Sequence, residues 1–259
     1  MSNNRTVTKA VILAAGKGTR MRELTNALPK PMLPWHGKPI LEHIVNGLKE
    51  TGFQEIFIVT GFMAGTIENH FGDGSRLGLK IRYARQVIQD GTGKAPELAR
   101  EFAGSDSFLL TYGDILVKPD TYRRMVGRFA GGEFSGLATV TVGQDVTKGG
   151  ILCFDRDFCL RKVVEKPSAT QMEELERAGW LRPGDPAWYN AGIYIFTPTL
   201  FEFTARLEKS PRGEYELTDA ISAMVAAGKT IAGLEIQGRW VDVRDPEVLA
   251  ALEAEQGSI

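Results

Sequence analysis

The stretch AVILAAGKGTR, from Ala10 to Arg20, decides the fold class of this 259-residue chain. Its first six residues form an apolar run, and the run ends in the glycine-rich segment Gly16-Lys17-Gly18. A short apolar run that leads directly into such a segment is typical of a buried parallel strand followed by a phosphate-facing loop. We therefore expect an α/β protein in which this loop lies at the carboxyl end of a central strand.

Apolar runs and helical patterns alternate in the residues that follow. The apolar stripe of residues 38–50 has helical spacing, and residues 55–60 form a second apolar run of strand length. The same reasoning predicts helices over 64–71 and 95–102 and strands over 79–84 and 107–111. Regular alternation of strand and helix argues for a parallel, doubly wound sheet.

The pattern changes after about Phe134, where strands outnumber helices. Strands are predicted over 137–142, 151–154, 160–164 and 191–196, and helices over 170–178 and 216–227. We expect these strands to extend the first sheet and to wall a second pocket. The sequence has no linker rich in Ser, Gly or Pro between the halves. Residues 1–259 are therefore predicted to form one domain with two lobes, about 9–133 and about 134–250.

Composition limits the partners that we expect. The formal net charge is −1, so there is no bulk positive field to attract nucleic acid or an anionic membrane. The chain has no apolar run near the roughly 18 residues of a membrane span, and residues 1–9 lack the apolar stretch of a secretory signal. Cys153 and Cys159 are the only cysteines, which favours reduced thiols in a cytoplasmic protein. The sequence leaves open whether the protein forms a homo-oligomer.

The loop of residues 16–30 carries the groups that a phosphate chain needs. Its glycines expose backbone N–H groups, and its basic side chains are Lys17, Arg20, Arg22 and Lys30. Together, such groups can hold the charge of a triphosphate or of a departing pyrophosphate. For Lys17 and Arg22, a solvated loop charge is an equally good interpretation.

Two familiar phosphate loops are excluded by single positions. A P-loop needs Gly-Lys followed by Ser or Thr, but Gly18 follows Lys17 and Ala95 follows Lys94. A dinucleotide-binding fingerprint would need a third glycine at position 21, which is Met21. The loop is therefore of a different kind.

Two aspartates on separate elements are candidates for holding one divalent cation. Asp114 follows an apolar strand and a glycine, and Asp242 follows Trp240 and Val241 near the C-terminus. Two carboxylates that share an ion with substrate phosphates are a usual form of magnesium site. Each also has a simpler interpretation, because Gly-Asp is a turn signal and Asp242 precedes the helix start at Asp245.

Three motifs in register from Leu13 onward resemble the signature of the sugar-phosphate nucleotidylyltransferases. That signature reads Leu-Ala-Gly/Ala-Gly-x-Gly-Thr-Arg, then Leu-Thr, then Pro-Lys-Pro, and it is matched by residues 13–20, 24–25 and 29–31. Other motifs follow in the family's order: Gly91-Thr92-Gly93, Tyr112-Gly113-Asp114, Glu165-Lys166-Pro167, Asn190-Ala191-Gly192 and Trp240-Val241-Asp242. The resemblance covers about residues 9–250.

The resemblance implies a Rossmann-like α/β/α three-layer nucleotidyltransferase fold with a mostly parallel central sheet. It also implies an enzyme that uses Mg²⁺, a nucleoside triphosphate and a sugar 1-phosphate. A phosphate oxygen of the sugar 1-phosphate would attack the α-phosphorus of the nucleotide, and pyrophosphate would leave. Because that oxygen is already an anion, no general base is needed, and catalysis is positioning and charge neutralisation.

Site residues carry over to the matching positions. As catalytic residues, Arg20 would hold the β- and γ-phosphates, and Lys30 would lie near the α-phosphate and the sugar phosphate. Asp114 and Asp242 would hold Mg²⁺. The sugar phosphate would be bound by Gly150, Glu165, Lys166 and Asn190, and the nucleotide by Leu13, Ala14, Gly16, Gly18, Thr19, Gln86 and Gly91.

The substrates follow from fewer residues. The Gln86 amide offers a donor and an acceptor to uracil or thymine, which favours UTP or dTTP, with glucose 1-phosphate as acceptor. Because the amide can turn to match cytosine, CTP is the alternative, and a purine would need a roomier pocket. A glycosyltransferase would need Asp-x-Asp, which Asp114-Ile115-Leu116 lacks. A non-catalytic paralogue would be expected to have lost Arg20, Lys30 or an aspartate.

Three positions depart from the family's pattern. Glu23 stands where many members have proline, which predicts a more mobile loop. Lys94 follows the glycine turn where a small residue is commoner, and it either reaches a phosphate or is solvated. Arg244 stands where glycine usually follows the second aspartate's motif, and it either narrows the metal site or marks an unusual substrate. Met21, Met32, Phe53 and Phe57 are interpreted as core or lid packing rather than ligand contacts. The same interpretation applies to His36, His43 and His70, which lack metal-ligand spacing.

Overall fold

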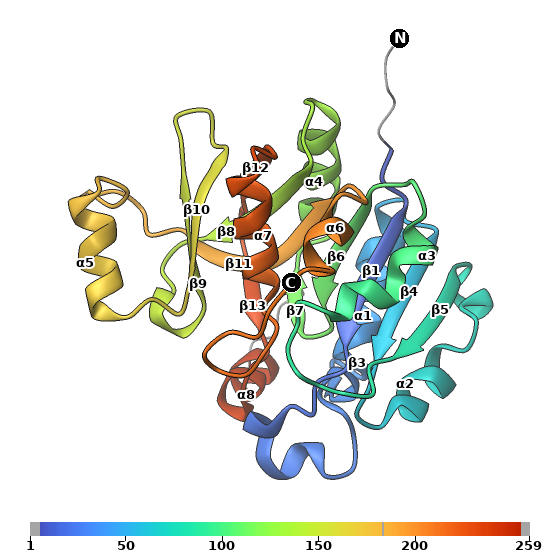
Figure 1. The fold of residues 1–259 in the computed structure, drawn as a ribbon. Helices are drawn as coiled ribbons and strands as arrows, with labels where there is room; N and C mark the ends of the chain where they lie inside the picture. The colour runs from blue at the N-terminus through green and yellow to red at the C-terminus, as the bar shows by residue number, and fades with distance from the viewer. Residues whose placement is uncertain (1–5, 183, 255–259) are drawn as a thin grey trace.

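A twisted β-sheet runs through the centre of the computed structural model, which describes residues 6–182 and 184–254 (Figure 1). Within these residues, the sheet has nine strands. Along its main path lie β5 (Lys80–Arg85), β4 (Glu55–Thr60), β1 (Lys9–Ala14), β6 (Phe108–Tyr112) and β11 (Tyr189–Phe196). Beyond β11 the sheet continues with β8 (Gly136–Thr141) and β12 (Ile231–Glu235), and β11 also pairs with β9 (Gly150–Phe154), which pairs with β10 (Leu160–Glu165).

Most of the main sheet is parallel, as predicted. β1 pairs in parallel with β4 and β6, β4 pairs in parallel with β5, and β12 pairs in parallel with β8. β11 is antiparallel to both β6 and β8, and β9 and β10 form an antiparallel pair. The carboxyl ends of β1, β4, β5 and β6 therefore share one edge of the sheet, where ligands bind in open α/β folds.

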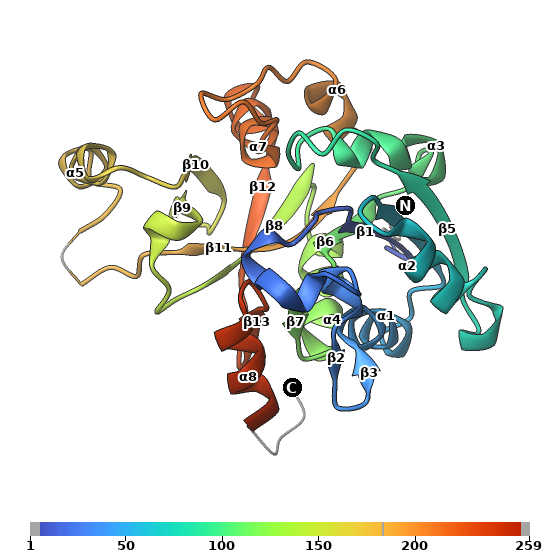
Figure 2. The same cartoon turned by 90° about the horizontal axis from the view of Figure 1, so that it is seen from below.

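Helices cover both faces of the sheet and give three layers. Alternate residues of β1 face different cores, with Ala10 and Ile12 in one and Val11 and Leu13 in the other. The first core includes α1 (Ile40–Glu50), α2 (Ala64–Phe71), α4 (Asp120–Ala130) and α8 (Pro246–Ala254). The second includes α3 (Arg100–Ala103), α6 (Leu200–Thr204) and α7 (Leu217–Ala226). Figure 2 shows α6 and α7 on one side of the sheet and α1 and α4 on the other.

A third, smaller core lies at the far end of the molecule. It packs α5 (Ala169–Arg177) against the β9–β10 pair through Ile151, Cys153, Leu175 and Tyr189. Figure 1 shows this arm at the left edge, away from α1 and α2. The later strands thus extend the sheet and form a separate wall, as the sequence indicates.

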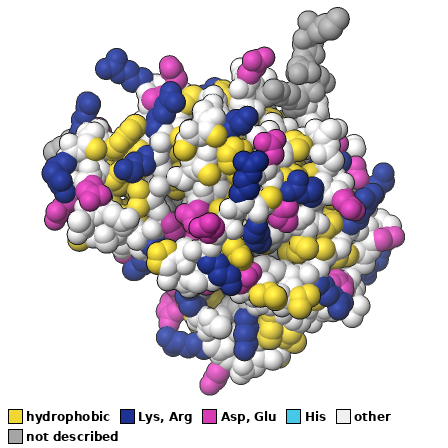
Figure 3. Space-filling view, in the orientation of Figure 1, with side chains coloured by type: hydrophobic (Ala, Val, Ile, Leu, Met, Phe, Trp, Pro, Cys, Tyr) yellow, Lys and Arg dark blue, Asp and Glu magenta, His cyan; other side chains and the backbone are white. Residues whose placement is uncertain are grey.

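Short elements complete the fold. The short strands are β2 (Pro34–Trp35), β3 (Lys38–Pro39), β7 (Ile115–Val117) and β13 (Trp240–Asp242), and the 3₁₀ helices are η1 (Thr19–Thr25), η2 (Lys30–Met32), η3 (Ser75–Leu77), η4 (Ala95–Ala99) and η5 (Val146–Lys148). Among residues 6–182 and 184–254, the helices lack the length and apolar character that crossing a membrane would require. Lysine and arginine side chains alternate with aspartate and glutamate over the face in Figure 3, in keeping with the near-neutral net charge.

The predicted strands agree with the observed ones to within two residues. The predicted helix 38–50 begins at Ile40, because Lys38 and Pro39 pair with Pro34 and Trp35 in a hairpin. The predicted helix 95–102 is η4 followed by α3. Helix α4 was missing from the predictions, although its buried Tyr122, Met125 and Phe129 have helical spacing. Strand β12 was missing as well.

Candidate active site

The loop after β1 folds back on itself. Gly18 has the left-handed φ of +66°, and a Cβ atom at this position would lie only 2.8 Å from Cβ of Lys30. The N–H of Met21 donates to the Gly18 carbonyl at 2.8 Å, and its side chain is fully buried. Met21 therefore anchors the loop in the core, as predicted, and the absence of a side chain at Gly18 lets Lys30 lie against the glycine segment.

A cavity of about 510 Å³ opens at the carboxyl ends of β1, β5 and β6. The strand ends and the loop after β1 supply one wall, and the glycine turn that contains Gly91 supplies another. All of the residues predicted to bind the nucleotide line this cavity: Leu13, Ala14, Gly16, Gly18, Thr19, Gln86 and Gly91. Lys17 lines it too, with its Nζ atom 5.8 Å from the ring centre of Phe62.

A second cavity, of about 310 Å³, lies beside the β9–β10 pair. The predicted sugar-phosphate residues Gly150, Glu165, Lys166 and Asn190 all line it. Gly150 pairs with Glu165 across the strands, and a Cβ atom at Gly150 would lie 3.2 Å from the Glu165 carboxylate and 3.4 Å from Cβ of Asn190. Residues from β9, β10 and β11 therefore meet at one point of the wall.

Lys166 has an unusual backbone for a residue with a side chain. Its φ is +44°, and its N–H donates to the Gly149 carbonyl at 2.5 Å. Non-glycine residues in the left-handed region are strained, and such strain is concentrated at functional sites. Here the strained backbone directs Lys166 into the second cavity.

The two cavities adjoin, because several side chains line both of them. Arg20, Lys30 and Asp114 are among these shared residues. The Lys30 ammonium lies 2.5 Å from a carboxylate oxygen of Asp114, and both side chains are mostly shielded from solvent. The predicted catalytic pair and the first predicted metal ligand thus lie at the junction of the cavities.

Asp242 lines the second cavity and is brought close to Asp114 by a strand pair that the sequence does not reveal. β13 pairs with β7 so that Asp242 lies opposite Ile115, and the N–H of Val243 donates to the Asp114 carbonyl at 3.0 Å. Burial raises the pKa of Asp242 to about 6, and the negative charge of Asp114 contributes to this increase. A bound cation would relieve the repulsion between the two carboxylates, so the donor set fits a hard divalent ion.

Sequence reasoning missed the segment of residues 209–216, which links the two cavities. Gly91 bridges to Tyr215, whose N–H donates to the Asp90 carbonyl at 2.8 Å, and Glu214 lines both cavities. The Arg212 guanidinium lies 2.7 Å from Glu216 and 3.8 Å from Glu165. Burial raises the pKa of Glu165, and the nearby positive charges oppose that rise. The run of charged residues directly before α7 is the sequence signal by which this segment could have been found.

Two other positions are placed by the structure. The Gln86 amide donates to the Gly91 carbonyl at 3.0 Å, so one of its donors supports the turn, and its contact with a base stays a prediction. Lys94 donates to the Ala205 carbonyl at 2.8 Å and lies over the Tyr215 ring. Lys94 was predicted either to reach a phosphate or to be solvated. Because it lines neither cavity, the structure does not favour a phosphate contact.

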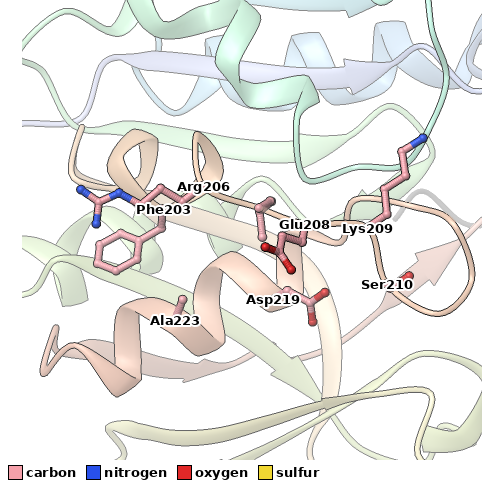
Figure 4. Close-up of a pocket in the computed structure, with 8 residues that line it drawn as sticks. Phe203, Arg206, Glu208, Lys209, Ser210, Asp219 and Ala223 are labelled. Carbon is pink, nitrogen blue, oxygen red and sulfur yellow. The ribbon is translucent and has the colours of Figure 1, made fainter.

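A third cavity, of about 430 Å³, shares no residue with these two. Figure 4 shows Asp219 and Ala223 projecting into it from α7, opposite the segment that carries Phe203 and Arg206. Burial raises the pKa of Asp219, and the charge of Glu216 does so further. No site residue was predicted here.

The family model for nucleotidyl transferases matches residues 9–256. This chain belongs to the nucleotidyl transferase family. It is 34% identical over 252 residues to the low-salt glycan biosynthesis nucleotidyltransferase Agl11 of Haloferax volcanii, with 96% of this chain and 65% of the relative covered. The UTP–glucose-1-phosphate uridylyltransferase AglF of the same organism is 32% identical over 243 residues, with 92% of each chain covered.

Other relatives are longer. The bifunctional protein GlmU of Methanococcus maripaludis is 34% identical over 243 residues, which are 93% of this chain and 53% of that protein. This chain thus spans between about half and two thirds of the length of Agl11 and GlmU.

Solved structures agree with the fold. A putative glucose-1-phosphate thymidylyltransferase from Bacillus anthracis has a TM-score of 0.80 at 25% identity, with 95% of this chain and 94% of that chain covered. A UDP-glucose pyrophosphorylase has a TM-score of 0.78 at 23% identity, with 95% and 97% covered. The predicted family and fold class are therefore confirmed, while the role of each site residue stays a prediction.

Proposed function

We propose that this protein transfers a nucleotidyl group from a nucleoside triphosphate to a sugar 1-phosphate and releases pyrophosphate. The observation that carries this proposal is the pair of adjoining cavities, one lined by the loop after β1 and one by the β9–β10 wall. Arg20, Lys30 and Asp114 stand where the two meet. A reaction that joins two phosphorylated substrates needs such a junction, with positive charge at the place where the phosphates approach.

Each cavity has a separate part in the proposed reaction. The first would hold the nucleotide, with its base near Gln86 and its phosphates along residues 16–20. The second would hold the sugar against Glu165 and Asn190, with its phosphate directed toward Lys166. The attacking oxygen would then face the α-phosphorus at Lys30, and Arg20 would stabilise the charge of the leaving pyrophosphate.

A divalent cation fits the junction, and we propose Mg²⁺. Asp114 and Asp242 would hold it, and phosphate oxygens and water would complete its coordination. Bound there, the ion would neutralise charge on the phosphates. Lys30 would orient the Asp114 carboxylate, because its ammonium contacts that carboxylate directly.

We propose UTP or dTTP as the nucleotide and glucose 1-phosphate as the sugar phosphate. AglF is named a UTP–glucose-1-phosphate uridylyltransferase, and the structural neighbour from Bacillus anthracis is named a putative glucose-1-phosphate thymidylyltransferase. Gln86 lines the first cavity, where an amide can match the polar edge of a pyrimidine.

The test is pyrophosphate release from UTP, dTTP, CTP, ATP and GTP, each with glucose 1-phosphate and with other sugar 1-phosphates. We expect kcat/KM to be highest for UTP or dTTP. A preference for ATP or GTP by about tenfold or more would contradict the pyrimidine assignment but leave the reaction class intact. Absence of pyrophosphate release with every pair would contradict the reaction itself.

Two cations should have different kinetic roles. Lys166→Ala is expected to raise the KM for the sugar 1-phosphate by about tenfold or more with little change for the nucleotide, because Lys166 lines only the second cavity. Arg20→Ala should mainly lower kcat, by about 10²-fold, because its charge is needed as pyrophosphate separates. Initial rates over both substrate concentrations measure this, and identical or exchanged profiles would refute the assignment.

A further inference from the structure

Arg244 lies two residues after the end of β13, and it lines both cavities at their junction. Within residues 6–182 and 184–254, seven residues line both cavities, and three of them are cations. They are Arg20, Lys30, Thr92, Tyr112, Asp114, Glu214 and Arg244. Arg20 comes from the loop after β1, and Arg244 comes from the connection between β13 and α8. The junction therefore has guanidinium groups from two segments that are distant in sequence.

The backbone around Arg244 fixes its position. Its N–H donates to the Asp242 carbonyl at 2.8 Å, and the preceding N–H, of Val243, donates to the Asp114 carbonyl. The main chain of Arg244 is thus tied to both predicted metal-binding segments. Only 28% of its side chain is exposed. The backbone of this residue is thus fixed, so binding a ligand would require ordering of the side chain alone.

The positive charge of Arg244 opposes the rise in the pKa of Asp242, and its one ion pair among residues 6–182 and 184–254 is a long one. Its Nε atom lies 3.8 Å from Asp245, near the outer limit for an ion pair. The other carboxylate oxygen of Asp245 accepts from the N–H of Val248 at 2.9 Å, in the first turn of α8. By contrast, Lys30 is in direct contact with Asp114 at 2.5 Å. The planar donor face of Arg244 therefore remains available toward the cavities.

We propose that Arg244 binds the two phosphates that become the diphosphate bridge of the nucleotide-sugar. The proposal rests on the proposed function, since it concerns the same site. In that reaction the bridge spans both cavities, and Arg244 is one of the few side chains that line both. A guanidinium is always charged and can donate two parallel hydrogen bonds to phosphate oxygens. A lysine at this position could supply the charge without that paired geometry.

A purely structural role makes a different prediction. If Arg244 only supports the start of α8 through Asp245, its loss should lower the melting temperature of the ligand-free protein and leave ligand affinity unchanged. If it binds the bridge, its loss should weaken the ligand and leave the ligand-free protein as stable as before. Thermal unfolding and calorimetry with UDP-glucose in the presence of Mg²⁺ distinguish the two.

The experiment compares Arg244→Gln, Arg244→Lys and the control Arg206→Gln, whose residue lines the separate third cavity. For Arg244→Gln we expect about 10-fold or greater loss in UDP-glucose affinity, about 10- to 100-fold loss in kcat/KM for both substrates, and an unchanged melting temperature without ligand. Arg244→Lys should recover part of both losses, and Arg206→Gln should match the wild type.

Each remaining outcome decides against a stated claim. If the wild-type enzyme is active and Arg244→Gln keeps wild-type UDP-glucose affinity and kcat/KM, the inference about Arg244 is overturned and the proposed function is not. A lowered melting temperature with unchanged UDP-glucose affinity also overturns it, in favour of the structural role. A wild-type enzyme that releases no pyrophosphate with any substrate pair overturns the proposed function, and the inference with it.

Discussion

Asp114→Asn and Asp242→Asn are each expected to lower kcat by about 10³-fold or more while leaving the protein folded. Asp114 lines both cavities and Asp242 lines the second, and burial and the charge of Asp114 raise the pKa of Asp242. Such a pair is costly unless a cation joins it, and loss of one ligand would remove much of the charge neutralisation on the phosphates. Pyrophosphate release at saturating Mg²⁺ measures the effect.

Asp155→Asn is the matched control for this prediction. Asp155 is also paired with a cation, Arg161, at 2.6 Å, and its side chain is 24% exposed, compared with 23% for Asp114. It lies outside both cavities, so its replacement should leave kcat within about threefold. The melting temperature of each variant shows whether folding is retained. Activity within about tenfold of wild type for Asp114→Asn or Asp242→Asn would remove that residue from the metal site.

The first half of the fold could be predicted because its signals are local. The apolar run of β1 is buried on both sides, and its alternate residues, such as Ile12 and Leu13, enter different cores. Such a run ending in glycines defines a central parallel strand before any contact is known. The stripe of α4 was equally local, with Tyr122 and Phe129 on one face. That helix could have been found by the same reasoning.

The assembly of the site could not be predicted in this way. Asp242 meets Asp114 because β13 pairs with β7, and this pairing joins segments more than a hundred residues apart. No local pattern specifies which short strand Trp240 to Asp242 will join. The bridge between Gly91 and Tyr215 is a second long-range pairing of this kind. The motif resemblance named the residues, and tertiary structure was needed to show that they converge.

The arginine at 244 illustrates the limit of motif matching. The sequence marks it only as a departure from glycine, with a narrowed metal site and an unusual substrate as open alternatives. Its position became informative once both cavities were known, because it lines each of them. A side chain that departs from a family pattern can thus only be interpreted together with its surroundings.

Lys30→Met is expected to lower kcat/KM by about 10²- to 10³-fold for both substrates. Lys30 lines both cavities and contacts Asp114 at 2.5 Å, so methionine would remove a cation that faces the reacting phosphates in the proposed reaction. It would also remove the cation that contacts Asp114 directly, leaving Arg20 and Arg244 as the positive charges near the two carboxylates. Lys30→Arg, which keeps the charge but is longer, should recover only part of the activity.

Lys94→Met is the control for Lys30→Met, because it removes the same positive charge at another position of the chain. Lys94 contacts the Ala205 carbonyl and the Tyr215 ring and lines neither cavity, so kcat/KM should change by less than about threefold. Adding Asp114→Asn to Lys30→Met should cost less than the product of the two single losses, since the residues act as one unit. Equal losses in Lys30→Met and Lys94→Met, or fully multiplicative losses in the double variant, would show that Lys30 does not work through this junction.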